Sequence, residues 1–95
     1  MDNQHRKITG YRELSQAEID LMNDIKAHAE QTRSLAARID VHLLLQAKRA
    51  READSINEHH RIGNAEPRRW LLIATTDFQT GFMALTRAVA QPTTF

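Results

Sequence analysis

The sequence has 95 residues and no cysteine, so it holds one domain at most and excludes disulfides, thiolate metal sites and a cysteine nucleophile. Thirteen basic and 12 acidic side chains give a formal net charge of +1, which does not indicate duplex DNA as a partner. No apolar run approaches the roughly 20 residues that span a bilayer, and the N-terminal residues lack the apolar stretch of a signal peptide. We therefore expect no membrane association and a cytoplasmic protein.

Residues 1–14 form a polar arm that is broken by Gly10. Ser15 and Glu18 have the spacing of a capping box, in which each side chain accepts a hydrogen bond from the backbone N–H of the other residue. Apolar residues then recur on one broad side at the helical period: Ile19, Leu21, Met22, Ile25, Ala29, Leu35, Ala36, Ile39 and Leu43. No glycine or proline interrupts residues 15–62, which predicts one long helix with its tip.

The far end of this predicted helix has a different composition. Residues 46–61 are charged nearly all round, which is typical of a solvated helical tip or a second short helix. Gly63 and Asn64 tolerate a left-handed backbone, so we expect the helix to stop there. A second helix is predicted over 66–90, with proline in its first turn and another proline just beyond its end. The fold class is therefore all-α: a single domain, 1–95, built as an antiparallel helical hairpin with a short N-terminal arm.

The second helix carries more apolar surface than one partner helix can cover. One face holds Trp70, Leu71, Ala74, Phe78, Gly81, Phe82, Leu85, Ala88 and Val89, whereas Leu72, Ile73, Met83, Ala84 and Ala90 lie off it. Small residues at 74, 81 and 88 recur every seven positions and would let another helix approach closely. We infer a homo-oligomer from this pattern. Trp70, the only tryptophan, is expected to pack in the core.

Two residues of the first half could contact a ligand. Tyr11, the only tyrosine, could stack on a base or ring, or it could pack on the hairpin as a clasp. Lys26 lies at the edge of the apolar side of the first helix, where an ammonium can bury its stem and meet a phosphate. An ordinary flanking lysine is the commoner explanation of Lys26, and the residues alone leave both alternatives open.

The second helix offers a possible anion site, and no catalytic site is recognisable. Arg69, Thr76, Thr80 and Arg87 line one stripe that could grip phosphates or form a solvated face. The five histidines do not have the spacing of a zinc site, so we expect no metal and no cofactor. A glycine-rich phosphate loop, a nucleophile elbow and a carboxylate pair are all absent from the sequence, which predicts a protein that is not an enzyme.

Two segments resemble a known family. His5–Leu14, HRKITGYREL, and Arg69–Pro92, RWLLIATTDFQTGFMALTRAVAQP, resemble the phage anti-CBASS cyclic-oligonucleotide sponges, whose hairpin is shared with the anti-Thoeris sponges. The resemblance also includes the first helix and omits about residues 46–66. It implies a homohexamer in the cytoplasm of the infected bacterial host. In that family, cyclic dinucleotides such as 3',3'-cyclic GMP–AMP bind between protomers and are sequestered without cleavage, which blocks CBASS defence.

The resemblance also implies roles for particular residues. An arm tyrosine that stacks on a base corresponds to Tyr11, and a first-helix lysine that meets the phosphates corresponds to Lys26. Two positions on, where we expect a small hydroxyl residue in the family, this sequence has His28. Some members bind cyclic trinucleotides at a second site near the start of the last helix. Arg69 is the matching residue, and we add Thr76 because it lies on the same stripe.

Two other function classes are compatible with the residues. Basic clusters at 5–7 and 48–51 would suit a small helical phage regulator that binds nucleic acid, although acidic residues follow the second cluster and no helix-turn-helix is recognisable. A purely structural assembly protein is the third class. Steep salt dependence of binding to long duplex DNA would favour the regulator, and tight binding of a cyclic dinucleotide would favour the sponge.

Overall fold

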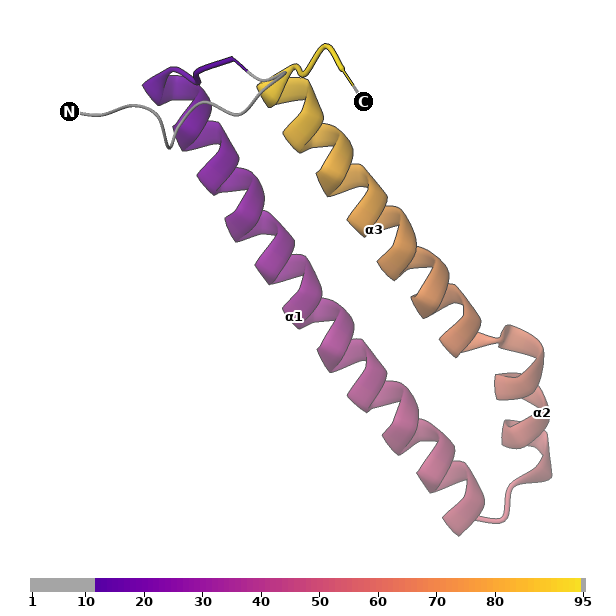
Figure 1. Cartoon of the computed structure of the whole chain (residues 1–95). Coiled ribbons are helices and arrows are strands. Elements are labelled where there is room, and N and C mark those ends of the chain that lie inside the picture. The colour runs from indigo at the N-terminus through magenta and orange to yellow at the C-terminus, as the bar shows by residue number, and fades with distance from the viewer. Residues whose placement is uncertain (1–11, 95) are drawn as a thin grey trace.

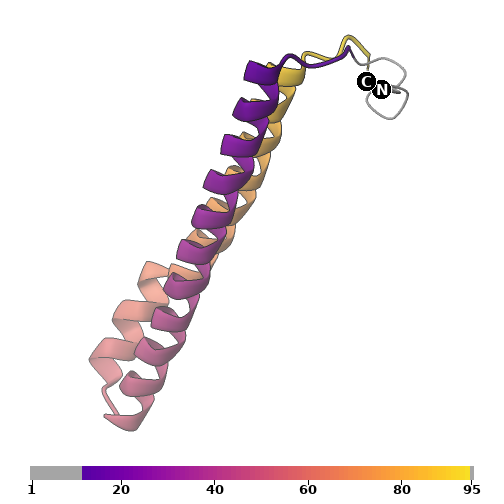
Figure 2. The ribbon, with the colours of Figure 1, turned by 90° about the vertical axis from the view of Figure 1, so that its left-hand side faces the viewer.

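A computed structural model of the chain describes residues 12–94 and shows that part to be all-helical. Helix α1 spans Gln16–Glu52, α2 spans Ile56–Ala65 and α3 spans Pro67–Ala90. Helices α1 and α3 run antiparallel, with α2 at the end of the hairpin away from the start of α1 and the end of α3 (Figure 1). A second view shows a slender rod, and the principal extents are 66 × 24 × 18 Å (Figure 2). The expected all-α hairpin is confirmed.

The start of α1 has the predicted capping box. The backbone N–H of Glu18 donates to Ser15 Oγ at 3.2 Å, and the Glu18 carboxylate accepts from the N–H of Ser15 at 2.9 Å. These two bonds satisfy backbone donors that the first turn of a helix leaves without partners. Tyr11, in contrast, lies outside the described residues.

The long first helix is interrupted, and the prediction of an unbroken helix over 15–62 is wrong at this point. Asp54 adopts a left-handed conformation with φ of 50°, and Ser55 then caps α2 by accepting from the N–H of Glu58 at 3.3 Å. Aspartate tolerates this conformation better than most residues, and serine is a favoured cap. The alternative of a second short helix is confirmed. Its signal was Ser55 followed three residues later by Glu58, as at the start of α1.

The predicted stop at Gly63 and Asn64 is also wrong, because both residues lie inside α2. The turn comes at Glu66, which is left-handed at φ 50° and ψ 52° and immediately precedes Pro67. A proline ring clashes with a continuing helix and restricts the residue before it, so the proline sets this boundary rather than the glycine. The end of α3 repeats the pattern: Gln91 is left-handed, with φ of 53°.

A single seam between α1 and α3 holds the hairpin together. Its half-buried members are Met22, Ile25, Ala29, Thr32, Ala36 and Leu43 on α1, and Leu71, Thr75, Phe82, Thr86 and Val89 on α3. Thr75 and Thr86 can lie in this apolar seam because their hydroxyls donate to the carbonyls of Leu71 and Phe82, at 2.9 and 3.0 Å. Among residues 12–94, only Ala50 is buried, with 3% of its surface exposed.

The seam leaves much of α3 uncovered. Trp70 is 58% exposed, Leu72 63% and Met83 72%, so the expectation that Trp70 packs in a core is wrong within this chain. In a hairpin, two helices share one contact surface. The sides of both helices that face away from this surface therefore stay open to solvent. Within the described range, no helix has both the length and the apolar character needed to cross a bilayer.

Candidate functional site

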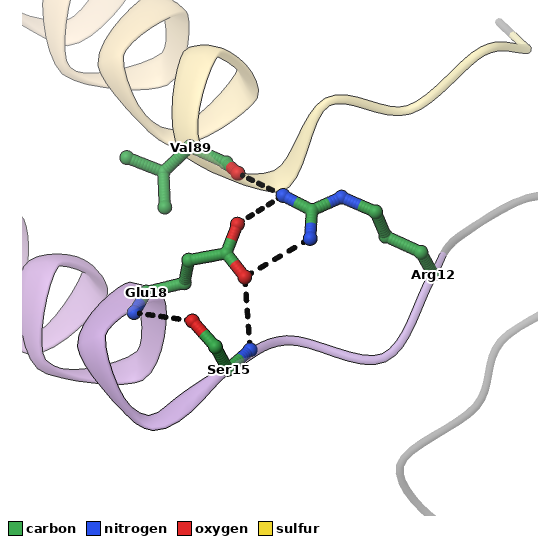
Figure 3. Close-up of polar contacts among 4 residues, drawn as sticks. All are labelled: Arg12, Ser15, Glu18 and Val89. Atoms are coloured by element: carbon green, nitrogen blue, oxygen red, sulfur yellow. Dashed lines mark hydrogen bonds and ion pairs between the residues drawn. The ribbon is translucent and has the colours of Figure 1, made fainter.

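The open end of the hairpin holds a polar cluster that joins the arm to both long helices (Figure 3). Arg12 Nη1 donates to the Glu18 carboxylate at 2.9 Å, and Nη2 bonds the other carboxylate oxygen of Glu18. The same Nη2 donates to the backbone carbonyl of Val89 in the last turn of α3, at 2.9 Å. We name Arg12, Ser15, Glu18 and the Val89 carbonyl the Arg12 clasp. It ties residue 12 to the beginning of α1 and the end of α3 at once.

The charges of the clasp suit both helix ends. Glu18 lies in the first turn of α1, where the helix dipole favours an anion, and the Arg12 guanidinium meets the last turn of α3, where the dipole favours a cation. Hydrogen bonds from Arg12, and then from the backbone and side chain of Ser15, lower the pKa of Glu18 to about 2. The bond to Glu18 correspondingly raises the pKa of Arg12. The pair stays ionised across the neutral range.

The two ligand-binding candidates on α1 lie on opposite sides of the seam. Lys26 and His28 are both exposed and two residues apart, which separates their side chains by about 160° around the helix. The structure therefore does not bring them together within one chain.

A groove of about 490 Å³ follows the His28 side of the seam. Its walls come from Leu21, Asp24, Ile25, His28 and Thr32 on α1, and from Phe82, Leu85, Ala88 and Val89 on α3. His28 and Asp24 are the titratable groups among these mainly apolar residues. The arrangement suits a flat, partly apolar ligand or an apolar side of another helix.

A second groove, of about 470 Å³, follows the opposite side of the seam. It is lined by Ala29, Glu30, Thr32, Arg33 and Ala36 on α1, and by Thr75, Phe78, Gln79, Phe82 and Met83 on α3. The rings of Phe78 and Phe82 stack with their centroids 6.5 Å apart. Lys26 lies on this side of α1, two turns before Arg33, because residues seven apart share a helix face. Sequence reasoning assigned the two phenylalanines to packing and did not identify this aromatic wall.

Lys26 is one of five basic side chains of residues 12–94 that make no ion pair, together with Arg38, Arg49, Arg51 and Arg87. Ion pairs within 4.0 Å engage six basic side chains of residues 12–94: Arg12, Arg33, Lys48, Arg61, Arg68 and Arg69. Within that range no carboxylate lies at ion-pair distance from the Lys26 ammonium. The position is thus a positive charge that is available to an anion without breaking an existing pair.

The second predicted site lies on the outward face of α3. Arg69 and Thr76 are exposed and seven residues apart, so they share the side of α3 that faces away from α1. Arg69 Nε lies 3.5 Å from Glu66 Oε2, and its guanidinium carbon lies 5.2 Å from the centre of the Trp70 ring. Farther along the same stripe, Thr80 and Arg87 line a groove of about 510 Å³.

No three histidine, aspartate or glutamate side chains of residues 12–94 are grouped so that they could hold a metal ion.

Comparison with known proteins identifies relatives along nearly the whole chain. Residues 3–90 match the family described as the Acb2/Tad1 hairpin domain. Anti-CBASS protein 2 of Pseudomonas phage JBD67 is 47% identical in an alignment that covers 97% of each sequence. The resemblance that rested on the two end segments and the first helix is confirmed, and the match includes the tip as well.

The Arg12 clasp predicts an acid-shifted titration. In the parent protein, the Glu18 carboxyl should titrate near pH 2, and Arg12→Ala should raise its pKa toward the ordinary value, because the strongest hydrogen bond to the carboxylate is lost. A lowered pKa in the folded state adds stability above the ordinary glutamate pKa, and this is lost as the pH falls toward 2. Carboxyl NMR across an acid titration measures both values. Glu58, whose pKa is lowered by its hydrogen bond from Arg61, is the internal reference and should not change in Arg12→Ala. An unchanged Glu18 pKa in Arg12→Ala would contradict the clasp.

Proposed function

This chain belongs to the Acb2/Tad1 hairpin family, and from that premise we propose that it is a phage anti-CBASS protein that binds cyclic dinucleotide signals and sequesters them uncleaved. The observation that carries the proposal is 47% identity to Anti-CBASS protein 2 over 97% of both chains. The aligned region includes both long helices and the segments that flank them. The proposed ligands are cyclic dinucleotides such as 3',3'-cyclic GMP–AMP, with cyclic trinucleotides at a second site.

The chemistry of the ligand fits a symmetric pair of these chains. A cyclic dinucleotide presents two phosphates and two flat bases, and a two-fold interface supplies each protein residue twice. Two copies of Lys26 would meet the two phosphates, and two copies of Tyr11 would stack on the two bases. A net charge of +1 does not oppose this arrangement, because the uncommitted charge at Lys26 is local and is doubled at the interface.

The exposed apolar surface supports assembly of several chains. Trp70, Leu72 and Met83 are each more than half exposed, and the single seam of the hairpin has no further helix to cover them. Burying apolar surface contributes roughly 25 cal/mol per Å². We propose a homo-oligomer, a hexamer by the family resemblance, in which these side chains contact neighbouring protomers.

Sequestration without cleavage is compatible with the electrostatics of the described residues. A general acid or base that works near neutral pH needs a pKa close to 7. The carboxyl groups with resolved shifts, Glu18 and Glu58, both have a lowered pKa, because each accepts hydrogen bonds from an arginine. These two carboxylates are therefore charged at neutral pH and held in ion pairs with arginine.

The central experiment is calorimetry of the purified protein against a panel of cyclic dinucleotides, followed by recovery of the bound ligand. We expect tight binding and intact cyclic ligand after heat denaturation of the complex, because the proposal contains no chemical step. Long duplex DNA is the control, titrated at several salt concentrations. Linear products would contradict sequestration, and strongly salt-dependent duplex binding without cyclic-nucleotide binding would favour a nucleic-acid regulator.

The assembly is tested by light scattering at micromolar concentration. We expect a mass several times the 10.9 kDa of one chain, near sixfold if the hexamer is correct, because the apolar sides of α3 need partners. Met83→Asp should shift the distribution toward smaller species, since a charge at a side chain that is 72% exposed in the monomer would be buried in the assembly. Asn64→Asp, at an exposed position on α2, is the matched control. A monomer at all concentrations would refute this part of the proposal.

Single substitutions separate the two proposed sites. Lys26→Ala should weaken cyclic dinucleotide binding by removing charge-assisted contacts of about 1.5–3 kcal/mol each. Tyr11→Ala should cost about 1–3 kcal/mol per stacked base. Both variants should keep the oligomer size and any cyclic trinucleotide affinity. Arg69→Ala should instead weaken cyclic trinucleotide binding and keep the cyclic dinucleotide affinity. Lys48→Ala, an exposed lysine near the far end of α1, is the control that should change neither affinity. Parent-like dinucleotide binding by Lys26→Ala and Tyr11→Ala would overturn the site assignment.

A further inference from the structure

One ion pair joins the two long helices directly. Arg68 Nη1, in the first turn of α3, lies 3.2 Å from Asp40 Oδ1 on α1. It is the one ion pair between α1 and α3 among residues 12–94, because the other five lie within one helix or next to a helix end. Asp40 Oδ1 is shielded from solvent and accepts no hydrogen bond from the described residues. The Arg68 guanidinium is therefore the charge that compensates a shielded carboxylate oxygen, which would be costly without it.

The apolar pattern of the seam does not by itself fix how far α3 extends along α1. Half-buried positions repeat every seven residues on both helices, at 22, 29, 36 and 43 on α1 and at 75, 82 and 89 on α3. A displacement by one repeat, about 10 Å along the helix axis, therefore brings seam positions opposite seam positions again. Phe82 lines one groove together with Ala29 and Ala36, so the same small side chain is available to its ring in either alignment.

The other contacts between the helices restrain sliding only weakly. A hollow of about 220 Å³ lies beside the ion pair, with Ala36, Leu71 and Thr75 in its lining, so side chains do not interlock closely at this level. Helix α2 has no buried residue to hold its position on α1. At the open end, the Arg12 clasp reaches α3 through a backbone carbonyl, a group that every residue offers. None of these contacts distinguishes one alignment from another by its chemistry, whereas a carboxylate and a guanidinium do.

We propose that the Asp40–Arg68 pair sets the register of α3 on α1, as a polar residue does in a coiled coil whose apolar seam allows several alignments. Sliding α3 by one repeat toward α2 would carry Arg68 from the level of Asp40 to that of Ala47 and leave both charges without a partner. The pair thus penalises an alignment that the apolar seam tolerates.

The register matters for the two grooves along the seam. Each groove takes one wall from α1 and the other from α3, so the register determines which side chains face each other across it. This inference goes beyond the proposed function and does not depend on it, because the alignment of the helices can be measured without any ligand.

The test measures the distance between two spin labels by pulsed electron paramagnetic resonance. The chain has no cysteine, so Ser34→Cys on α1 and Ala84→Cys on α3, both at exposed positions, provide two unique label sites. Labelled chains are refolded with an excess of unlabelled chains, so that distances between copies do not contribute. The protein with the native ion pair should give one distance, since a minor alignment is populated at roughly 0.1–10%.

Asp40→Asn and Arg68→Gln should each add a second distance in more than about 10% of the molecules, because each removes one charge of the pair. The exchange of Asp40→Arg with Arg68→Asp should restore the single distance, since the pair forms again with its charges reversed. Glu52→Gln is the matched control: it removes a carboxylate of α1 whose ion pair with Lys48 lies within one helix, and it should keep the single distance.

Circular dichroism of each variant separates register from folding. We expect the helical signal of the parent in all of them. If both single variants keep the parent distance alone, or if the charge exchange gives the second distance as well, the pair does not set the register. Loss of the helical signal in the single variants would also contradict the proposal, because the pair would then be needed for folding rather than for alignment.

Discussion

A hairpin of two helices gives each helix one partner, and this constraint determines most of the other features of the molecule. The main seam of the described residues joins α1 to α3, and only Ala50, near the end of α1, is buried. A large part of the apolar surface of α3 consequently faces outward. Grooves form along both sides of the seam. The backbone N–H and C=O groups at the helix ends are hydrogen-bonded by local caps and by the Arg12 clasp. We propose an assembly of several chains for the same reason: the chain has no further helix to cover the outward apolar side chains of α3.

The helices were predictable from the sequence where their ends are set by side-chain chemistry. The Ser15 and Glu18 capping box and the two prolines marked three boundaries correctly. The errors at Asp54 and at Gly63 share one cause: the chain turns at Asp54 and Glu66, which adopt a left-handed backbone that side chains other than glycine rarely favour. Sequence reasoning expected that conformation at Gly63, whereas the neighbouring cap and proline determined where it occurs.

Some features of the candidate site could be predicted from residue spacing, and others only from the tertiary structure. Placement of Lys26 and His28 on opposite sides of α1 follows from a separation of two residues in a helix. The Arg12 clasp could not be predicted, because no sequence pattern links Arg12 to a backbone carbonyl 77 residues away. Trp70 was misplaced because a period of 3.6 identifies an apolar face without saying whether its partner belongs to the same chain.

Charge pairing connects the fold to the proposed chemistry. A net charge of +1 predicts little attraction for an anion, yet net charge averages over cations that carboxylates already hold. Arg33, Arg68 and Arg69 are neutralised in this local sense, whereas Lys26 is not. Arg12 makes more contacts than any of these: it bonds both the Glu18 carboxylate and the carbonyl of Val89 at the end of α3. In the function proposed here, Lys26 can meet a phosphate of the ligand because no carboxylate already holds its ammonium.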